Sequence, residues 1–245
     1  MSIKLLICLF ILFLPTQQTF AQIKHDAFTQ LLQKHVSTDG KVNYKGFIKD
    51  SIQLKQYLKQ LSKNPPTNQW TKQEQMAFWI NAYNAFTIDL VIRHYPVKSI
   101  KDIGSSIQIP FVNTPWDIKF IKIGKEQLDL NNIEHSKLRK QFGDARLHMV
   151  LVCASKSCPS LSREAYEANT LEQQLNDASK KFLTDKTKNQ IQTQQSKLSM
   201  IFRWYAMDFN KNGKKVLDFV NQHQSTPINT KTKIDYLDYD WNLNE

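Results

Sequence analysis

The sequence predicts an α+β fold: a single main domain in which several helices pack on a small mixed or antiparallel sheet, preceded by a helical N-terminal lobe. Three observations support this prediction. Residues 72–94 form a long apolar segment that begins with helix-capping residues. Short strand candidates follow without the regular strand–helix alternation of a parallel sheet. The composition, 41% hydrophobic and 22% charged, is that of an ordinary globular protein.

The N-terminus has the pattern of a secretory signal peptide. Lys4 precedes an apolar run from Leu5 to Leu14, and residues 19–21 end in a small residue, Ala21. The run has ten residues, about half of what a membrane span needs. We therefore expect residues 1–21 to be a cleaved signal peptide. The protein is then secreted or periplasmic, with no stable membrane span after cleavage.

The strongest break in the remaining chain is Asn-Pro-Pro-Thr at residues 64–67. Before it, apolar residues recur at helical spacing over residues 25–36 and 47–61, which predicts a helical N-terminal lobe over residues 22–66. This lobe is too small to hold a core of its own. We interpret the break as a connection to the main domain, residues 67–245, rather than as a boundary between independent domains.

Local patterns predict the elements of the main domain. Thr71 and Glu74 form a capping box. The helix predicted after it is apolar on all sides, which is typical of a buried helix. A second capping box, Thr170 with Gln173, predicts another helix. The remaining expected elements are strands at 118–123 and 127–130, a helix from Asn131 or Asn132 to about 141 closed by Gly143, a strand at 147–153, a hairpin of 190–193 with 197–201, a helix at 216–221 and a strand-like tail at 234–241.

The charge balance and the absence of common motifs narrow the function. The chain has 33 Lys and Arg against 22 Asp and Glu, a net charge of +11, but the basic residues are scattered. Secretion makes nucleic acid an unexpected partner, so we expect at most weak attraction to anionic envelope polymers. The sequence contains no H-E-x-x-H, P-loop, G-x-S-x-G or G-x-G-x-x-G motif. We therefore expect no cofactor and no metal.

Asn81 and Asn84 are the most unusual residues of the long apolar helix. They lie three positions apart, next to Trp79, on a helix that must be buried. A buried amide without a partner costs about 1–3 kcal/mol, so each needs one. Either the two amides hold the backbone of neighbouring loops, or one of them lines a pocket or orients a catalytic imidazole.

A histidine and two cysteines follow in one segment. The predicted strand carries His148 near its start and Cys153 at its end, and Cys158 comes directly before Pro159. Because Pro is common at the first position of a helix, we expect Cys158 at a helix N-terminus. There the helix dipole and Lys156 would lower the pKa of its thiol. The alternatives are a Cys153–Cys158 disulfide, a reactive thiol and a pair of metal ligands.

Ile133-Glu134-His135 lies early in a predicted helix. Glu134 is a candidate acid or orienting group, and His135 is a candidate base. The alternative is a charged first turn that complements the helix dipole.

Several of these segments together resemble the domain of unknown function 547 family. The resemblance extends over roughly Thr71 to Trp241 and implies a secreted bacterial protein, but neither a substrate nor an activity. The segments that carry it are A-F-W-I-N-A-Y-N at 77–84, I-E-H at 133–135, the stretch from His148 to Pro159, I-F-R-W-Y-A-M-D-F at 201–209 and Y-D-W at 239–241.

The residues support three hypotheses of function. The first is a thiol-dependent hydrolase or acyl transferase, with Cys158 as nucleophile, His148 as base and Asn81 or Glu134 as orienting group. The other candidate pocket residues are Trp79, Asn84, His135 and Cys153. In papain-like and transglutaminase-like enzymes the Cys precedes the His, which is the reverse of the order here.

The second hypothesis is a non-catalytic envelope module that binds a peptide or a glycan in a groove of tryptophans, with Cys153–Cys158 as a structural disulfide. The tryptophans concerned are Trp79, Trp116, Trp204 and Trp241, and the alternative for these side chains is packing in the core. The third hypothesis is a redox partner of an envelope thiol system, which uses the cysteine pair.

Overall fold

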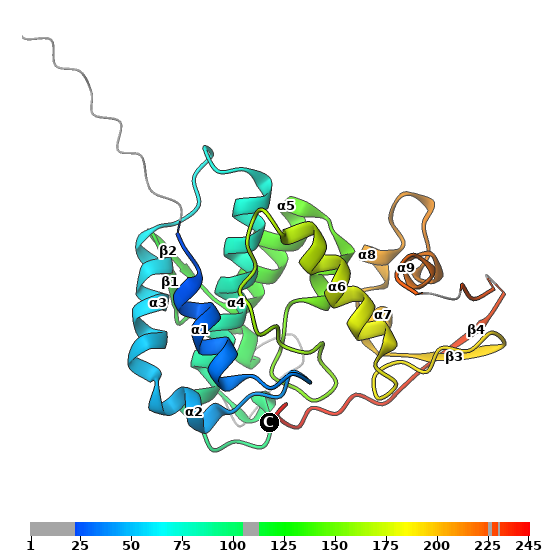
Figure 1. The fold of residues 1–245 in the computed structure, drawn as a ribbon, viewed down its shortest axis with the longest axis horizontal. Helices are drawn as coiled ribbons and strands as arrows, with labels where there is room; N and C mark the ends of the chain where they lie inside the picture. The colour runs from blue at the N-terminus through cyan, green and yellow to red at the C-terminus, as the bar shows by residue number, and fades with distance from the viewer. Residues whose placement is uncertain (1–22, 105–112, 225–226, 230) are drawn as a thin grey trace, which may run out of the picture.

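The computed structural model describes residues 23–104, 113–224, 227–229 and 231–245. The expected signal peptide, residues 1–21, lies outside the described residues. The structure confirms an α+β fold in which helices predominate and the strands of the described chain form two small sheets (Figure 1). No helix of the described ranges is both long and apolar enough to cross a membrane.

Helix α4 (Lys72–His94) forms the centre of the fold and confirms the predicted helix. It begins at the predicted capping box, in which the Glu74 amide donates to Thr71 Oγ1 at 3.2 Å and the Thr71 amide donates to the Glu74 carboxylate at 2.6 Å. Every residue from Met76 to Val91 is buried. The all-round apolar sequence is therefore explained by neighbours on every side of the helix.

Three N-terminal helices cover part of α4. They are α1 (Asp26–His35), α2 (Tyr44–Lys49) and α3 (Ser51–Lys63), and α2 and α3 both pack against α4 (Figure 1). Their apolar faces belong to the same hydrophobic core as α4. The N-terminal residues thus bury their apolar surface in the main body of the protein.

The segment after α4 follows the predicted order. Strands β1 (Ile121–Ile123) and β2 (Glu126–Leu128) form an antiparallel pair around Gly124, whose φ of 59° suits the tight turn. The predicted helix after them is present as a π-helix, η3 (Asn132–Arg139), which packs on α4 and continues into α5 (Lys140–Phe142). It ends at Gly143, at a φ of 62°.

The strand predicted over residues 147–153 is wrong. Residues Ala145–Met149 form a short 3₁₀ helix, η4, and residues 151–153 have no regular secondary structure. The amide of Asn84 supplies the hydrogen bonds that a strand would provide: it donates to the Val150 carbonyl at 2.9 Å and accepts from the Val152 amide at 3.0 Å. A short apolar run indicates burial, and this contact from α4 determines its shape.

The helix predicted after Thr170 is present as α6 (Leu171–Thr184), although its predicted capping box is wrong. Thr170 is the N-cap residue but its side chain caps no backbone amide. Its hydroxyl lies 3.2 Å from the Gln174 side chain, and Gln174 also contacts the backbone of Glu167 and Ala165. The loop before α6 is therefore held by the glutamine.

The C-terminal third builds a second hydrophobic core around Phe202. The hairpin predicted between residues 190–193 and 197–201 is wrong in its main strand pairing. Gln190 and Lys197 form an antiparallel bridge, but β3 (Gln195–Leu198) pairs in parallel with β4 (Lys233–Tyr236). The helices of this region are α7 (Ile201–Trp204), α8 (Ala206–Phe209) and α9 (Val216–Gln222), with the 3₁₀ turn η5 (Lys211–Gly213) between the last two. The helix expected at 216–221 is thus confirmed.

The C-terminal tail, residues 237–245, returns to the N-terminal half of the molecule, and Figure 1 places the C-terminus near α2. The Leu243 amide donates to the Lys98 carbonyl at 2.9 Å. The Asn244 amide donates to the Ala154 carbonyl at 3.1 Å, and the Asn244 carbonyl accepts from Val42 at 2.8 Å. The tail therefore joins the N-terminal helices, the chain after α4 and the cysteine loop, residues 153–158.

We expect Asn84→Ala to destabilise the protein strongly. The substitution leaves the buried Val150 carbonyl and Val152 amide without partners, at a cost of about 1–3 kcal/mol for each group. The free energy of unfolding, measured in urea, tests this, with the exposed Lys72→Ala as a matched helix control. Equal stability of the Asn84 variant and the control would contradict the role of this amide.

Candidate functional site

Five segments that the sequence analysis identified converge in the structure. They are residues 77–84, 133–135, 148–159, 201–209 and 239–241. Side chains from these segments, together with Trp116, Arg139 and Lys211, form three groups: a histidine–aspartate cluster, a disulfide with its tyrosine, and an aromatic surface. Each group is described in turn.

Asn81 and Asn84 hold loop backbone. Asn81 donates to the Tyr166 carbonyl at 2.8 Å and accepts from the Tyr166 amide at 2.8 Å, as Asn84 does for Val150 and Val152. In the described part of the chain, no hydrogen bond joins Asn81 to His148 or to Cys158. The structural interpretation of the two asparagines therefore accounts for their contacts.

The histidine–aspartate cluster is centred on Asp208. His148 Nε2 lies 2.8 Å from Asp208 Oδ2, and Arg139 Nε donates to the same oxygen at 2.6 Å. Lys211 Nζ lies 3.4 Å from Oδ1. The hydrogen bonds from His148 and then from Arg139 hold the pKa of Asp208 well below its usual range. Tyr205 stacks on the His148 ring, with centroids 3.9 Å apart, so His148 is buried between its partners.

Glu134 and His135 differ in exposure, and His135 Nδ1 lies 4.0 Å from Glu134 Oε1. Glu134 is buried, and its Oε1 has no hydrogen-bond partner among the described residues. Burial, followed by the charge of Glu134, raises the pKa of Tyr205. His135 is exposed and its Nδ1 lies 2.7 Å from Arg139 Nη1. Arg139 therefore connects His135 to the histidine–aspartate cluster.

Cys153 and Cys158 form a disulfide, with their Cα atoms 6.3 Å apart. The Tyr239 hydroxyl lies 3.2 Å from Cys158 Sγ and 3.4 Å from Cys153 Sγ, and Ser155 Oγ donates to it at 3.1 Å. Cys158 is only 2% exposed. Among the described His, Cys, Asp and Glu side chains, no group of three or more lies in an arrangement suited to a metal ion.

The helix expected to begin after Cys158 is absent, so the helix-dipole argument for a low thiol pKa was wrong. Residues 159–163 have no regular secondary structure. The Cys158 amide instead donates to the Ser155 carbonyl at 3.1 Å, which closes a turn. Pro at the first helical position is a weak signal, because the same residue also suits turns and extended chain.

The aromatic surface consists of Trp116, Trp204, Tyr239 and Trp241. The Trp241 ring lies 4.6 Å from Tyr239, 5.7 Å from Trp204 and 5.8 Å from Trp116, measured between centroids. Trp204 is 46% exposed and the other three are half-buried. Three of the four tryptophans proposed for a groove therefore lie together.

Trp79, the fourth tryptophan of the proposed groove, is a core residue. It is 5% exposed, its ring meets the edge of Phe78, and Lys137 Nζ lies 5.4 Å from the ring centroid. Its place in the all-round apolar sequence of α4 agrees with this packing.

A cavity of about 610 Å³ opens beside the aromatic surface. Its lining includes the aromatic residues Trp204, Tyr239 and Trp241. It also includes Met200 and Leu237 and the polar residues Arg203, Asp235, Tyr236 and Asp238. The guanidinium carbon of Arg203 lies 5.8 Å from the centroid of the Tyr236 ring. The cavity thus combines flat apolar faces with hydrogen-bonding groups of both kinds.

Sequence reasoning missed the roles of Arg139, Tyr205, Asp208 and Tyr239. Tyr205 and Asp208 lie inside the segment 201–209, and Tyr239 inside 239–241, so the family resemblance includes these positions without indicating what they contact. Arg139 lies four residues after His135 on η3, a spacing that places both on one side of a helix. That spacing is the local signal for this pair.

Residues 67–183 match the model of a family described as "Protein of unknown function, DUF547". No curated protein and no solved structure matches the chain significantly. The match covers α4, η3, the cysteine loop and α6, and it ends before Trp204, Tyr205 and Asp208.

We expect Asp208→Asn to weaken the fold and to flatten its response to acid. The folded-state pKa of Asp208 is depressed, so its ionised form adds stability above its unfolded pKa of about 3.9, and this stability is lost as the pH falls toward the folded pKa. The loss at pH 7 should be about 1–3 kcal/mol. Unfolding followed from neutral to strongly acidic pH tests this, with the exposed Asp177→Asn as control. A parallel pH profile of wild type and Asp208→Asn would refute it.

We expect the protein that begins at Gln22, purified without reductant, to resist alkylation at both cysteines. Its intact mass should lie about 2 Da below that of the dithiol, because two hydrogens leave when the disulfide forms. Cys153→Ser with Cys158→Ser should lower the free energy of unfolding by about 2 kcal/mol, the closure entropy of a short loop. Two freely alkylated thiols in the native protein would exclude the disulfide.

Proposed function

We propose that this protein, whose residues 67–183 form a domain of the DUF547 family, is a secreted or periplasmic binding module that holds a glycan chain on its aromatic surface. The observation that carries the proposal is the side-by-side placement of Trp204, Tyr239 and Trp241 along a cavity of about 610 Å³. A cluster of partly exposed aromatic rings beside a cavity is typical of a binding surface.

The polar groups around the cavity favour a glycan over a peptide. A sugar ring presents an apolar C–H face and hydroxyl groups that both donate and accept hydrogen bonds. The aromatic rings match the apolar face, the carboxylates of Asp235 and Asp238 accept, and Arg203 donates. Many peptides instead bind by extending a sheet edge or by placing side chains in pockets, while proline-rich peptides also dock on aromatic-lined grooves.

Envelope location is supported by the signal-peptide pattern and by the disulfide. Disulfides persist in oxidising compartments, where secreted proteins function. The net charge of +11 adds long-range attraction to the anionic polymers of the envelope. These arguments support a ligand outside the cytoplasm.

A thiol-dependent enzyme has less support. The sulfur of Cys158 is bonded to Cys153 and buried, so it is not available as a thiolate nucleophile. His148 directs Nε2 to Asp208 and stacks on Tyr205. Reducing the disulfide would free the thiol, but the helix N-terminus that would activate it is missing.

We expect Trp204→Ala and Trp241→Ala each to weaken glycan binding about 30-fold, the effect of losing an aromatic hot spot of about 2 kcal/mol. Calorimetric titration with chitohexaose and cellohexaose, and sedimentation with purified peptidoglycan, measure the binding. Met207→Ala is the matched control, because Met207 is 83% exposed next to the surface and does not line the cavity.

Three outcomes decide the proposal. Binding to one of these glycans that depends on both tryptophans and not on Met207 supports it. Binding that survives both tryptophan substitutions would place the ligand elsewhere and overturn it. Binding of an unstructured peptide library, with no binding of any of the three glycans, would assign the same surface to peptides instead.

A further inference from the structure

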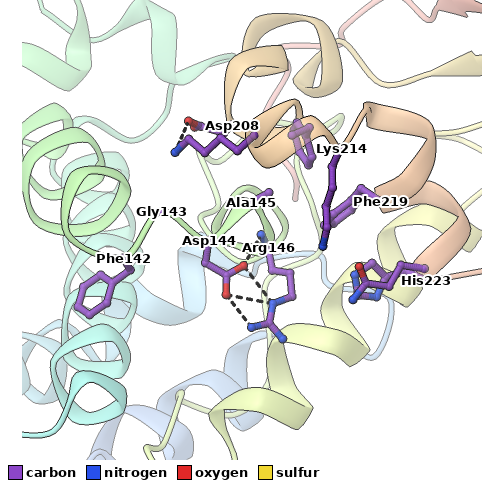
Figure 2. Close-up of a pocket in the computed structure, with 12 residues that line it drawn as sticks. Phe142, Gly143, Asp144, Ala145, Arg146, Asp208, Lys214, Phe219 and His223 are labelled. Atoms are coloured by element: carbon purple, nitrogen blue, oxygen red, sulfur yellow. Dashed lines mark hydrogen bonds and ion pairs between the residues drawn. The ribbon is translucent and has the colours of Figure 1, made fainter.

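A second cavity, of about 420 Å³, lies between η4 and the C-terminal helices. This cavity shares no lining residue with the cavity beside the aromatic surface. Figure 2 shows its wall: Arg146 and Asp144 come from the start of η4, while Lys214, Phe219 and His223 come from α9 and the turn before it. Phe142 and Phe219 add apolar surface.

The two carboxylates that line this cavity are already neutralised. Asp144 accepts three hydrogen bonds from the guanidinium group of Arg146, at 2.6–3.1 Å. Asp208 accepts from His148 and Arg139, and its Oδ1 lies 3.4 Å from Lys211 Nζ. Neither carboxylate therefore needs a cation from a ligand, and neither leaves an uncompensated negative charge at the cavity wall.

The same cavity also contains a polar atom that has no hydrogen-bond partner among the described residues. His223 is 9% exposed, and its Nε2 has no partner among the described residues. Burial, and then the charge of Arg146, lower the pKa of His223, which favours the neutral ring. In the tautomer with its hydrogen on Nε2, this atom is a donor. A buried polar atom without a partner costs free energy that a ligand atom would recover.

Lys214 and Arg146 supply two more donors. Figure 2 shows the Lys214 side chain extending toward Arg146 and His223. The described ion pairs at this cavity involve Arg146 and Lys211, and none involves Lys214. Arg146 directs Nε and Nη2 to Asp144 and Nη1 to Glu172 and Asn176, which leaves one of the five guanidinium hydrogens, on Nη2, unused.

We propose that this cavity binds a small molecule through its phosphate group, with Lys214, His223 and the remaining Arg146 hydrogen as donors. Three donors from three side chains suit the three terminal oxygens of a phosphate ester better than the two oxygens of a carboxylate. Lys214 supplies the positive charge that is not already paired. The cavity is large enough for a ligand body beyond the phosphate, and Phe142 and Phe219 would contact it.

Titration of the purified protein with inorganic phosphate, glycerol 3-phosphate and acetate tests this site. Calorimetry measures affinity, and long-range ¹H–¹⁵N spectra of the imidazoles follow the pKa of His223. We expect both phosphates to bind, the ester at least as tightly as the free ion, and acetate much more weakly. A bound anion should raise the pKa of His223, because negative charge favours imidazolium.

Lys214→Gln should weaken phosphate binding about tenfold, while Lys215→Gln, the adjacent lysine outside the cavity lining, should leave it unchanged. His223→Gln tests the second donor without adding charge. Equal affinity for phosphate and acetate, equal effects of the two lysine substitutions, or a His223 pKa that phosphate does not move would each overturn the proposal. Lack of binding by both phosphates would do the same.

Discussion

The two asparagine amides on the buried helix α4 are the contacts on which the arrangement of the site depends. A helix surrounded by core offers no water to polar side chains, so Asn81 and Asn84 must find partners in other parts of the chain. They pair with both the amide and the carbonyl groups of the facing loops. Asn84 thereby fixes the residues between His148 and Cys153 at α4. The histidine and the disulfide loop are consequently positioned without a strand.

The C-terminal tail also holds the cysteine loop in place, as Asn84 holds the residues before it. Its residues bond the cysteine loop through Lys156 and Ser157, and the chain after α4 through Lys98. The Tyr239 hydroxyl contacts both sulfurs, while its ring packs on Trp204 and Trp241. Two of the four residues of the aromatic surface are therefore held at separate points. Tyr239 contacts the disulfide, and Trp204 belongs to α7. These contacts link segments about 80 residues apart in the sequence, such as Cys158 and Tyr239.

The parts of the structure that sequence reasoning predicts are those with local causes. The Thr71–Glu74 capping box and an apolar run on all sides predict α4, because both signals lie within one helix. The positions of Gly124 and Gly143 predict a turn and a helix end for the same reason. The predicted strand over 147–153 was wrong because an apolar run reports burial and not backbone shape. Asp208 was missed because its partners Arg139 and His148 are 69 and 60 residues away.

The same nonlocal contacts support the proposal of binding over thiol chemistry. An aromatic side chain that is held at its polar end, as Tyr239 is by Ser155 and the disulfide, loses little further freedom when a ligand packs on it. Trp204 gains similar order because α7 is followed directly by α8, whose Asp208 is tied to Arg139 and His148. The histidine–aspartate cluster thus restricts the movement of Trp204 in the aromatic surface. Binding to a surface whose side chains are already ordered costs less conformational entropy. This saving matters most for a flexible ligand such as a glycan, which itself loses entropy when it binds.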